Sequence, residues 1–224
     1  MFQPTPSPIL ERNTTRELVN VKRSPSTPVR VIKLGGSLLT LPDLTSRLER
    51  WLTRQPPMFN LCIVGGGQPV QNIRDLGCSA DSSESHWSAV QQMDVHARSL
   101  SQRSPSWIYF DSLNSYSFIS PTTINFFGVE NWLRNEIHCL PESWDVTSDS
   151  IAVILARFLN AEELILLKST LPQSDRTLMQ LIDEGYVDRH FKTALTSSDD
   201  HQLSTIEHVK FVNFRDKELM ELKL

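Results

Sequence analysis

Short apolar runs alternate along the chain with longer stretches of helical periodicity. Apolar runs rich in β-branched residues predict buried strands at 29–34, 59–64, 107–110, 164–167 and 209–214, the last of these as the final strand. Apolar residues three or four positions apart predict helices at 38–54, 68–76, 86–100, about 148–159 and 178–184. Residues 112–147 show only one short helix, around Trp132 to Ile137. This alternation predicts a three-layer α/β/α sandwich around a mostly parallel sheet.

The first 28 residues differ from the remainder of the chain. They hold five of its 13 prolines among serine, threonine, asparagine and arginine, with little apolar patterning. This composition predicts a mostly disordered arm with at most a short helix at 15–21. The alternative is an arm that docks on a partner subunit. Residues 29–224 are predicted to form a single domain.

Two glycine clusters each follow a predicted strand directly. They read KLGGS at 33–37 and VGGG at 64–67, and together they contain five of the chain's eight glycines. Such turns expose backbone N–H groups that bind anions, so Gly35, Gly36 and Ser37 with Gly65, Gly66 and Gly67 predict a polyphosphate site. Neither cluster matches GxxxxGK[ST] or GxGxxG, which argues against a Walker A loop and a Rossmann dinucleotide site.

Three charged residues stand where this site would lie. Lys33 is the last residue but one of its strand, at the sheet edge where ligands bind in open α/β folds, although a strand-end lysine can also extend into solvent. Asp149 falls in the first turn of a helix, where it either complements the helix dipole or orients Lys33 or a phosphate-bound Mg²⁺. Lys168 ends a strand and is either a second catalytic charge or a structural residue.

These motifs, with TSDSIA at 147–152, resemble in order and spacing the amino-acid kinase superfamily, which includes acetylglutamate, carbamate, aspartate, uridylate and isopentenyl phosphate kinases. The resemblance covers roughly residues 29–215. It implies that Lys33 contacts the transferred phosphoryl group and that the first glycine turn, with Ser148, binds the phosphates of ATP. It also implies that Gly65–Gly67 hold the acceptor and that Asp149 positions the lysines.

Further segments, HWSA at 86–89 and GYVD at 185–188 among them, resemble the small kinases linked to aminomethylfuran phosphate in methanofuran and tetrahydromethanopterin pathways. Isopentenyl phosphate and fosfomycin kinases have a histidine just after the second glycine turn, where this chain reads QPVQ at 68–71. The chain also lacks the Gly-Gly-Met segment and the later lysine of most members, so the resemblance leaves Lys168 as the candidate second charge.

Two residues are candidates for the acceptor side. Arg74 follows the second glycine turn on a helix and could bind the acceptor's phosphate or carboxylate, although a solvated arginine is equally natural there. His86 could face the acceptor, or it could pack and anchor a loop beside Trp87. The six histidines have no metal-ligand spacing, which argues against a transition-metal site. No serine has a histidine and acid pattern for hydrolysis.

Charge and composition limit the partners. A net charge of -4 gives no reason to expect nucleic acid or an anionic membrane as partner, and no apolar stretch reaches the roughly 20 residues of a membrane span. Three cysteines without CxxC spacing predict reduced thiols in the cytoplasm.

The leading hypothesis is an ATP- and Mg²⁺-dependent kinase whose acceptor is a small phosphate or carboxylate, with aminomethylfuran phosphate as the specific prediction. The alternative is a catalytically reduced nucleotide- or oxyanion-binding protein on the same scaffold. The resemblance also implies a homodimer or higher homo-oligomer.

Overall fold

One mixed β-sheet forms the centre of the protein. The computed structural model describes residues 28–75, 83–113, 122–137, 140–173, 175–197, 203–216 and 221–223. The strands are β1 (Val29–Leu34), β2 (Phe59–Val64), β3 (Ile108–Phe110), β4 (Ile124–Phe127), β5 (Glu163–Lys168), β6 (Val209–Asn213) and β7 (Glu221–Lys223). Their order in the sheet is β3-β4-β2-β1-β5-β6-β7, and every neighbouring pair is parallel except β6 with β7. The predicted mostly parallel sheet is confirmed.

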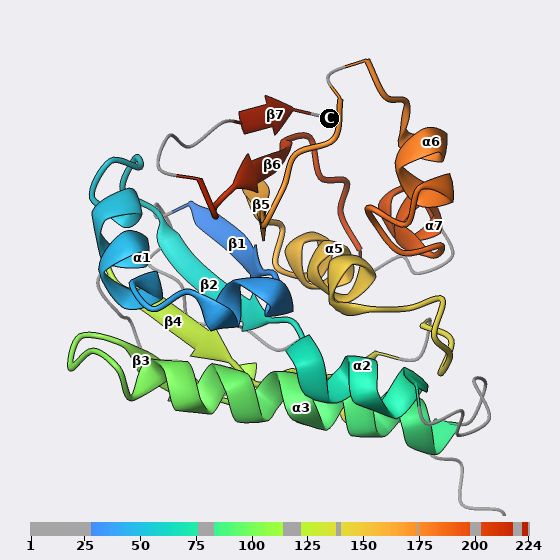
Figure 1. The fold of residues 1–224 in the computed structure, drawn as a ribbon, viewed down its shortest axis with the longest axis horizontal. Helices are drawn as coiled ribbons and strands as arrows, with labels where there is room; N and C mark the ends of the chain where they lie inside the picture. Colours follow the sequence, from blue (N-terminus) through green and yellow to red (C-terminus); the bar gives the residue numbers. More distant parts are fainter. Residues whose placement is uncertain are drawn as a thin grey trace, which may run out of the picture.

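Helices cover both faces of this sheet. They are the 3₁₀ helix η1 (Gly36–Thr40) and the α-helices α1 (Leu44–Leu52), α2 (Gly67–Asp75), α3 (Ser83–Ser101), α4 (Glu130–Glu136), α5 (Ser148–Phe158), α6 (Leu178–Asp183) and α7 (Phe191–Thr196). Figure 1 shows α1 and α5 on opposite sides of the strands, with α2 lying beside α3. The arrangement confirms the three-layer α/β/α architecture.

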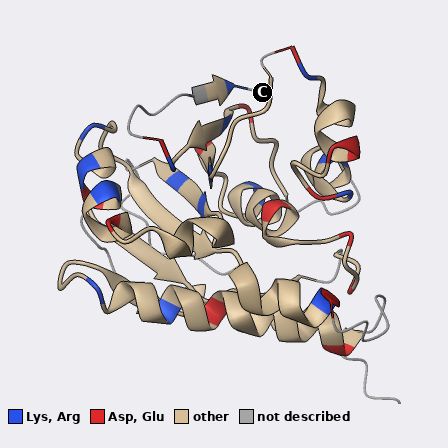
Figure 2. Cartoon of the chain, in the orientation of Figure 1, with Lys and Arg blue, Asp and Glu red and all other residues tan. Residues whose placement is uncertain are grey.

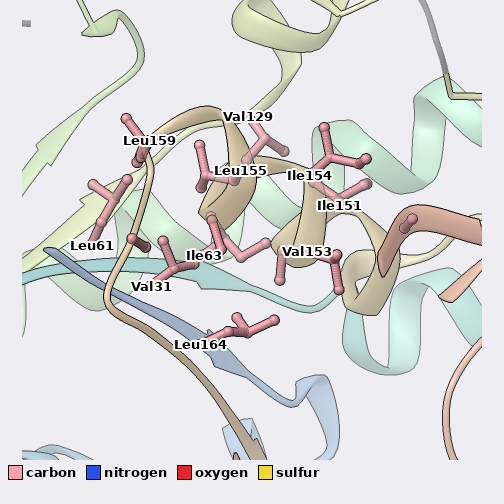
Figure 3. Close-up of a cluster of buried hydrophobic side chains, with 14 of the residues drawn as sticks. Val31, Leu61, Ile63, Val129, Ile151, Val153, Ile154, Leu155, Leu159 and Leu164 are labelled. Carbon is pink, nitrogen blue, oxygen red and sulfur yellow. The ribbon is translucent and has the colours of Figure 1, made fainter. Parts of the chain in front are cut away.

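Two apolar clusters lie on the two faces of the sheet. On one face, Val31, Leu61 and Leu164 pack with Ile151 and Leu155 of α5 (Figure 3). On the other face, the alternate strand residues Ile32, Cys62 and Ile165 form a cluster with Leu44, Leu48 and Trp51 of α1. Because side chains alternate along a strand, every second residue of β1 and β5 points toward α5. Lys33 and Lys168 fall on that face.

The predicted helix over 38–54 is wrong at its start. The chain forms η1 first, and α1 begins only at Leu44. Pro42 interrupts the helical pattern because a proline disfavours helical geometry in the residue before it, and Leu41 accordingly has the extended angles φ -74° and ψ 123°. The first glycine turn therefore leads into one short 3₁₀ turn rather than a long helix.

Other elements differ from the sequence predictions mainly where the apolar pattern is short. The stretch at 112–147 contains β4 as well as the expected short helix α4, and the expected loop at 78–85 gives way to α3 from Ser83. β6 is not the last strand, because β7 follows it in antiparallel pairing. α7 was not predicted, since only Phe191 and Ala194 of its six residues are buried.

Several predictions fall outside the described residues. They include the disorder and short helix of the N-terminal arm, Cys78 and Cys139, while Cys62 is buried and has no disulfide partner among the described cysteines. The single-domain prediction for 29–224 stays a prediction. Within the part of the chain that the structure describes, no helix is both long enough and apolar enough to cross a membrane.

Charged residues enter the sheet only on particular strands. Figure 2 shows β2 and β4 without charged residues, whereas β1 carries two. At the amino end of β1, the fully buried Arg30 pairs with Glu163 of β5, which also accepts a hydrogen bond from Lys210 Nζ at 2.7 Å. Burial opposes ionisation of Glu163, but Lys210 and Arg30 outweigh it and lower the pKa of this carboxyl. The ion pair joins the two strands that carry Lys33 and Lys168.

Replacing Glu163 with glutamine should lower the free energy of unfolding by about 3 kcal/mol, because it leaves the buried Arg30 guanidinium without a counter-charge. Urea denaturation measures the loss. The matched control is Glu184→Gln, which removes a more exposed pair with Arg176 and should cost at most about 1 kcal/mol. Equal losses in the two variants would contradict a structural role for the buried pair.

Candidate functional site

The two glycine turns meet at the carboxyl edge of the sheet. Gly35 N donates a hydrogen bond to Leu167 O of β5, and Gly65 N donates one to Leu34 O of β1, both at 2.8 Å. A Cβ atom on Gly36 would lie 2.3 Å from Gly67 N, so the turns touch backbone to backbone. Gly67 also has a φ of +59°, which side chains other than glycine rarely adopt. The structure thus joins the two clusters in one site.

Lys33 and Lys168 approach the same carboxylate. Leu34 of β1 pairs in register with Leu167 of β5, which places the two lysines at neighbouring strand ends on the face that α5 covers. Lys33 Nζ lies 2.8 Å from Asp149 Oδ1, and Lys168 Nζ lies 2.7 Å from Asp149 Oδ2. Asp149 stands in the first turn of α5, as the sequence predicted. Of the two readings of Asp149, the geometry favours the one in which it orients lysine.

These three charges are largely removed from solvent. The side chains of Lys33 and Asp149 are each 7% exposed, and that of Lys168 is 13% exposed. Burial disfavours the ionised form of Asp149, but the charges of Lys168 and Lys33 outweigh it and lower its pKa to about 2. Burial lowers the pKa of Lys168, and the negative charge of Asp149 works against that shift. The group of three carries one net positive charge when all are ionised.

The segment after α6 holds this group in place. Tyr186 O accepts a hydrogen bond from Lys168 Nζ at 2.7 Å, and the tyrosine ring centroid lies 4.9 Å from the same nitrogen. Asp188 accepts hydrogen bonds from the backbone N–H and the hydroxyl of both Thr147 and Ser150 at the start of α5. Sequence reasoning assigned no role to Asp188, because its partners lie 41 and 38 residues away along the chain.

A cavity of about 400 Å³ opens beside the second glycine turn. Gly36, Ser37, Gly65–Gly67 and Ser148 line one side of it, and apolar residues of α2, α3 and α5 line another. Arg74 and His86, the two predicted acceptor residues, both reach this cavity. Arg74 is exposed, and its guanidinium lies 4.6 Å from the centroid of a Trp144 ring, a cation–π contact that orients it.

His86 both anchors a loop and lines the cavity. Its Nδ1 lies 3.2 Å from Ser143 O, so this nitrogen donates to the carbonyl and the loop before α5 is tied to α3. Burial lowers the pKa of His86. The two readings that the sequence left open for His86 are therefore compatible with each other.

A second cavity, of about 720 Å³, lies on the other side of the Arg74 and Trp144 pair. Asp149 and Lys168 line it together with Tyr186 and Asp188. The two cavities share Arg74, Trp144 and Thr147 as lining residues. Asp149 and Lys168 therefore line the second cavity, whereas the glycine turns line the first.

The first glycine turn has neighbours that the sequence did not reveal. Ser37 Oγ donates to Ser169 Oγ at 3.1 Å, and Arg215, just after β6, donates from Nη2 to Ser37 O at 2.7 Å. On the second turn, His96 Nδ1 of α3 lies 3.2 Å from Gly65 O. No local motif marks Arg215 or His96, and the contact of Ser169 with the first turn, like theirs, forms only through the tertiary fold.

The residues suit a polyphosphate better than a protein-held metal ion. Backbone turns and two lysines supply N–H donors and positive charge, which phosphate oxygens require. Among the described residues, no three histidine, cysteine or acidic side chains are grouped to hold a metal. Both oxygens of Asp149 are taken by lysines, so a Mg²⁺ ion would have to be held by the phosphates it accompanies.

Replacing Asp149 with asparagine should lower the free energy of unfolding at pH 7 by about 3 to 5 kcal/mol, because two buried lysines lose their shared counter-charge. The folded pKa of Asp149 lies below its unfolded value, so its stabilisation is present above about pH 4 and is lost as the pH falls toward 2. Urea denaturation across that range should show that the free energy of unfolding falls less with decreasing pH in the variant than in the wild type.

Asp145→Asn is the control, since Asp145 is an exposed carboxylate four residues away. In this variant, the free energy of unfolding should fall with decreasing pH as steeply as in the wild type. If it falls as steeply in Asp149→Asn too, Asp149 is not a buried carboxylate paired with two lysines.

The fold is shared with bacterial UMP kinases. The crystal structure of UMP kinase from Bacillus anthracis is similar with a TM-score of 0.54 and 13% identity, over 88% of this chain and 98% of that one. That from Ureaplasma parvum is similar with a TM-score of 0.54 and 11% identity, over 88% and 100%. Uridylate kinase from Archaeoglobus fulgidus has a TM-score of 0.46 and 17% identity, over 75% and 86%. No protein-family model matches the sequence, and no curated protein matches it either. The chain has the α/β fold of the UMP kinases, which belong to the amino-acid kinase superfamily.

Proposed function

We propose that this chain is a small-molecule kinase that transfers the γ-phosphoryl group of ATP to a phosphate or carboxylate group. The observation that carries the proposal is the pair of buried lysines on one carboxylate, set where two glycine turns meet. The shared fold with UMP kinases supports the same class of reaction. We assign the donor phosphates to the first turn and the acceptor to the second.

The lysines would stabilise charge as it moves between the two substrates. An ammonium group has three N–H donors. Lys168 uses two of them on Asp149 and Tyr186 O, and Lys33 uses one on Asp149. The remaining donors can bind oxygens of the transferred group, where negative charge is redistributed in the transition state. Asp149 keeps both ammonium groups aligned before the substrates arrive.

The class of acceptor follows from the same chemistry. An acceptor oxygen attacks the γ-phosphorus in line, the bond from that phosphorus to the bridging oxygen breaks, and ADP leaves with the electron pair. A phosphate or carboxylate oxygen is already deprotonated at neutral pH, so no general base has to remove a proton. Mg²⁺ carried by the nucleotide would neutralise phosphate charge.

The cavity beside the second turn supplies the acceptor's surroundings. Arg74 can pair with an anionic group, since its guanidinium is a rigid fork of donors for phosphate or carboxylate. The apolar lining from Val70, Val90, Met93 and Ile151 suits a small organic body. Aminomethylfuran phosphate remains the specific acceptor prediction, and a homo-oligomer and a cytoplasmic location remain predictions as well.

The second candidate is a nucleotide- or oxyanion-binding protein with reduced catalysis. It is favoured by Lys168, because two of its three N–H donors are engaged within the protein. Tight binding of ATP by the wild type, without turnover on any phosphate or carboxylate acceptor, would support this candidate over the kinase.

Lys33→Ala should reduce phosphoryl transfer by at least about a hundredfold, since it removes a donor aimed at the transferred group. ADP release is measured with a panel that includes aminomethylfuran phosphate, uridine monophosphate and simple carboxylates. Lys192→Ala, on the exposed side of α7, is the control and should turn over like the wild type. Unchanged turnover in Lys33→Ala would exclude stabilisation of the transferred group by the two lysines.

Arg74→Ala should raise the KM for the acceptor by roughly tenfold while kcat changes little, because Arg74 binds a part of the acceptor that does not react. The KM for ATP should stay near the wild-type value. Arg50→Ala, an exposed arginine on α1, serves as the control. A loss of kcat at constant acceptor KM would instead place Arg74 at the reacting centre.

A further inference from the structure

Asp188 caps the helix that carries Asp149. Its Oδ2 accepts from Thr147 N at 2.9 Å, from Thr147 Oγ1 at 2.8 Å and from Ser150 N at 3.0 Å, and its Oδ1 accepts from the Ser150 hydroxyl. Thr147 and Ser150 lie on either side of Asp149 along the chain. One carboxylate thus fixes the backbone both before and after the residue that binds the two lysines.

The same short segment also holds one of those lysines. Tyr186 O accepts from Lys168 Nζ at 2.7 Å, two residues before Asp188. Between them, Val187 is 2% exposed and belongs to the apolar cluster on the α5 face of the sheet. Residues 186–188 therefore connect Lys168, the start of α5 and the core within one tripeptide, which we call the 186–188 clamp.

We infer that Asp188 is a positioning residue for the proposed phosphoryl transfer, acting through the start of α5 to hold Asp149 where both lysines meet it. This inference rests on the proposed function. Asp188 makes no contact with either lysine in the described hydrogen bonds and ion pairs, so it acts through Thr147, Ser150 and Asp149. A shift of α5 would alter the geometry of both ion pairs together, because both end on the Asp149 carboxylate.

The charges around Lys168 agree with this geometric argument for Asp188. The titratable groups near Lys168 are Asp149 of α5, Lys33 of β1, and Tyr186 and Asp188 after α6. The negative charge of Asp188 raises the pKa of Lys168 and so helps to keep this buried ammonium charged. Burial, with the nearby charge of Asp149, raises the pKa of Asp188 itself, while the hydrogen bonds from Ser150 and Thr147 oppose that shift.

An ordinary helix cap would stabilise the fold without affecting kcat or the pH profile of the site. The chain offers a comparison, because Thr177 caps α6 in a reciprocal pair of bonds with Gln180. Thr177→Ala should therefore lower the melting temperature by a few degrees, as loss of a cap does, and leave the site intact. Asp183 offers a second comparison, since it is an exposed carboxylate that lines the same cavity as Asp188.

The test compares Asp188→Asn with Thr177→Ala and Asp183→Asn in the full chain. Asparagine keeps the size of the side chain but loses the charge and part of its capacity to accept. We expect kcat for phosphoryl transfer to fall roughly tenfold to a hundredfold in Asp188→Asn, as misplacement of reacting groups does, with ATP affinity near that of the wild type. The basic limb of its pH profile should move to lower pH, because Lys168 loses a charge that raises its pKa. Both controls should keep the wild-type kcat and pH profile.

A second readout does not depend on turnover. The carbon next to the lysine nitrogen is followed by NMR against pH in protein labelled at lysine, with Lys168→Arg to assign the signal. Lys168 should titrate at lower pH in Asp188→Asn than in the wild type and in both controls. If Lys168 titrates alike in all variants, or if kcat in the folded Asp188→Asn equals that of the controls, the positioning role is overturned. A wild type that transfers phosphate to no acceptor would refute the proposed function, and the lysine titration would still decide the role of Asp188.

Discussion

The arrangement of the site depends on one buried carboxylate shared by two buried ammonium groups. A lysine is costly to bury alone, and this protein places two at adjacent strand ends with side chains only 7% and 13% exposed. Asp149 lies within 2.8 Å of one and 2.7 Å of the other, which makes both positions tolerable. That contact depends on the position of α5, on the register of β1 with β5 and on the 186–188 clamp.

The close approach of the two glycine turns lies at the same carboxyl edge of the sheet as this charged group. Gly36 and Gly67 meet without side chains between them, so the turns that follow β1 and β2 form one floor. The net charge of the two lysines and Asp149 is positive, and the lysines stand at the ends of β1 and β5, where the chain continues into the first glycine turn or donates to it. A preorganised set of this kind stabilises an anion without rearrangement at the moment of reaction. This is the physical basis for assigning phosphoryl transfer to the site.

The sequence predicts those elements of the fold and site that are determined by local sequence patterns. Alternating strands and helices indicate the layered fold, and KLGGS and VGGG indicate the two turns, since both depend on neighbours along the chain. Lys33, Asp149 and Lys168 are identifiable as candidates, and the family resemblance implies that Asp149 positions the lysines. The residue pattern alone does not show this convergence, because it requires the register of β1 with β5 and the placement of α5. Asp188, His96 and Arg215 act on residues far away in sequence, and no spacing reveals them. β7 and α7 are missed because each is short and only partly buried, and the start of α1 is misplaced because Pro42 outweighs a convincing apolar period.

Whether the lysine pair and the glycine turns bind a nucleotide can be tested by a crystal structure of the protein with Mg²⁺ and a non-hydrolysable ATP analogue. We expect the β- and γ-phosphates to lie over Gly35–Ser37, with the γ-phosphate oxygens within hydrogen-bond distance of Lys33 Nζ and Lys168 Nζ. Asp149 should remain in contact with both lysines. An analogue whose phosphates bind elsewhere, with Lys33, Asp149 and Lys168 paired only to one another, would contradict a role for these three residues in phosphoryl transfer.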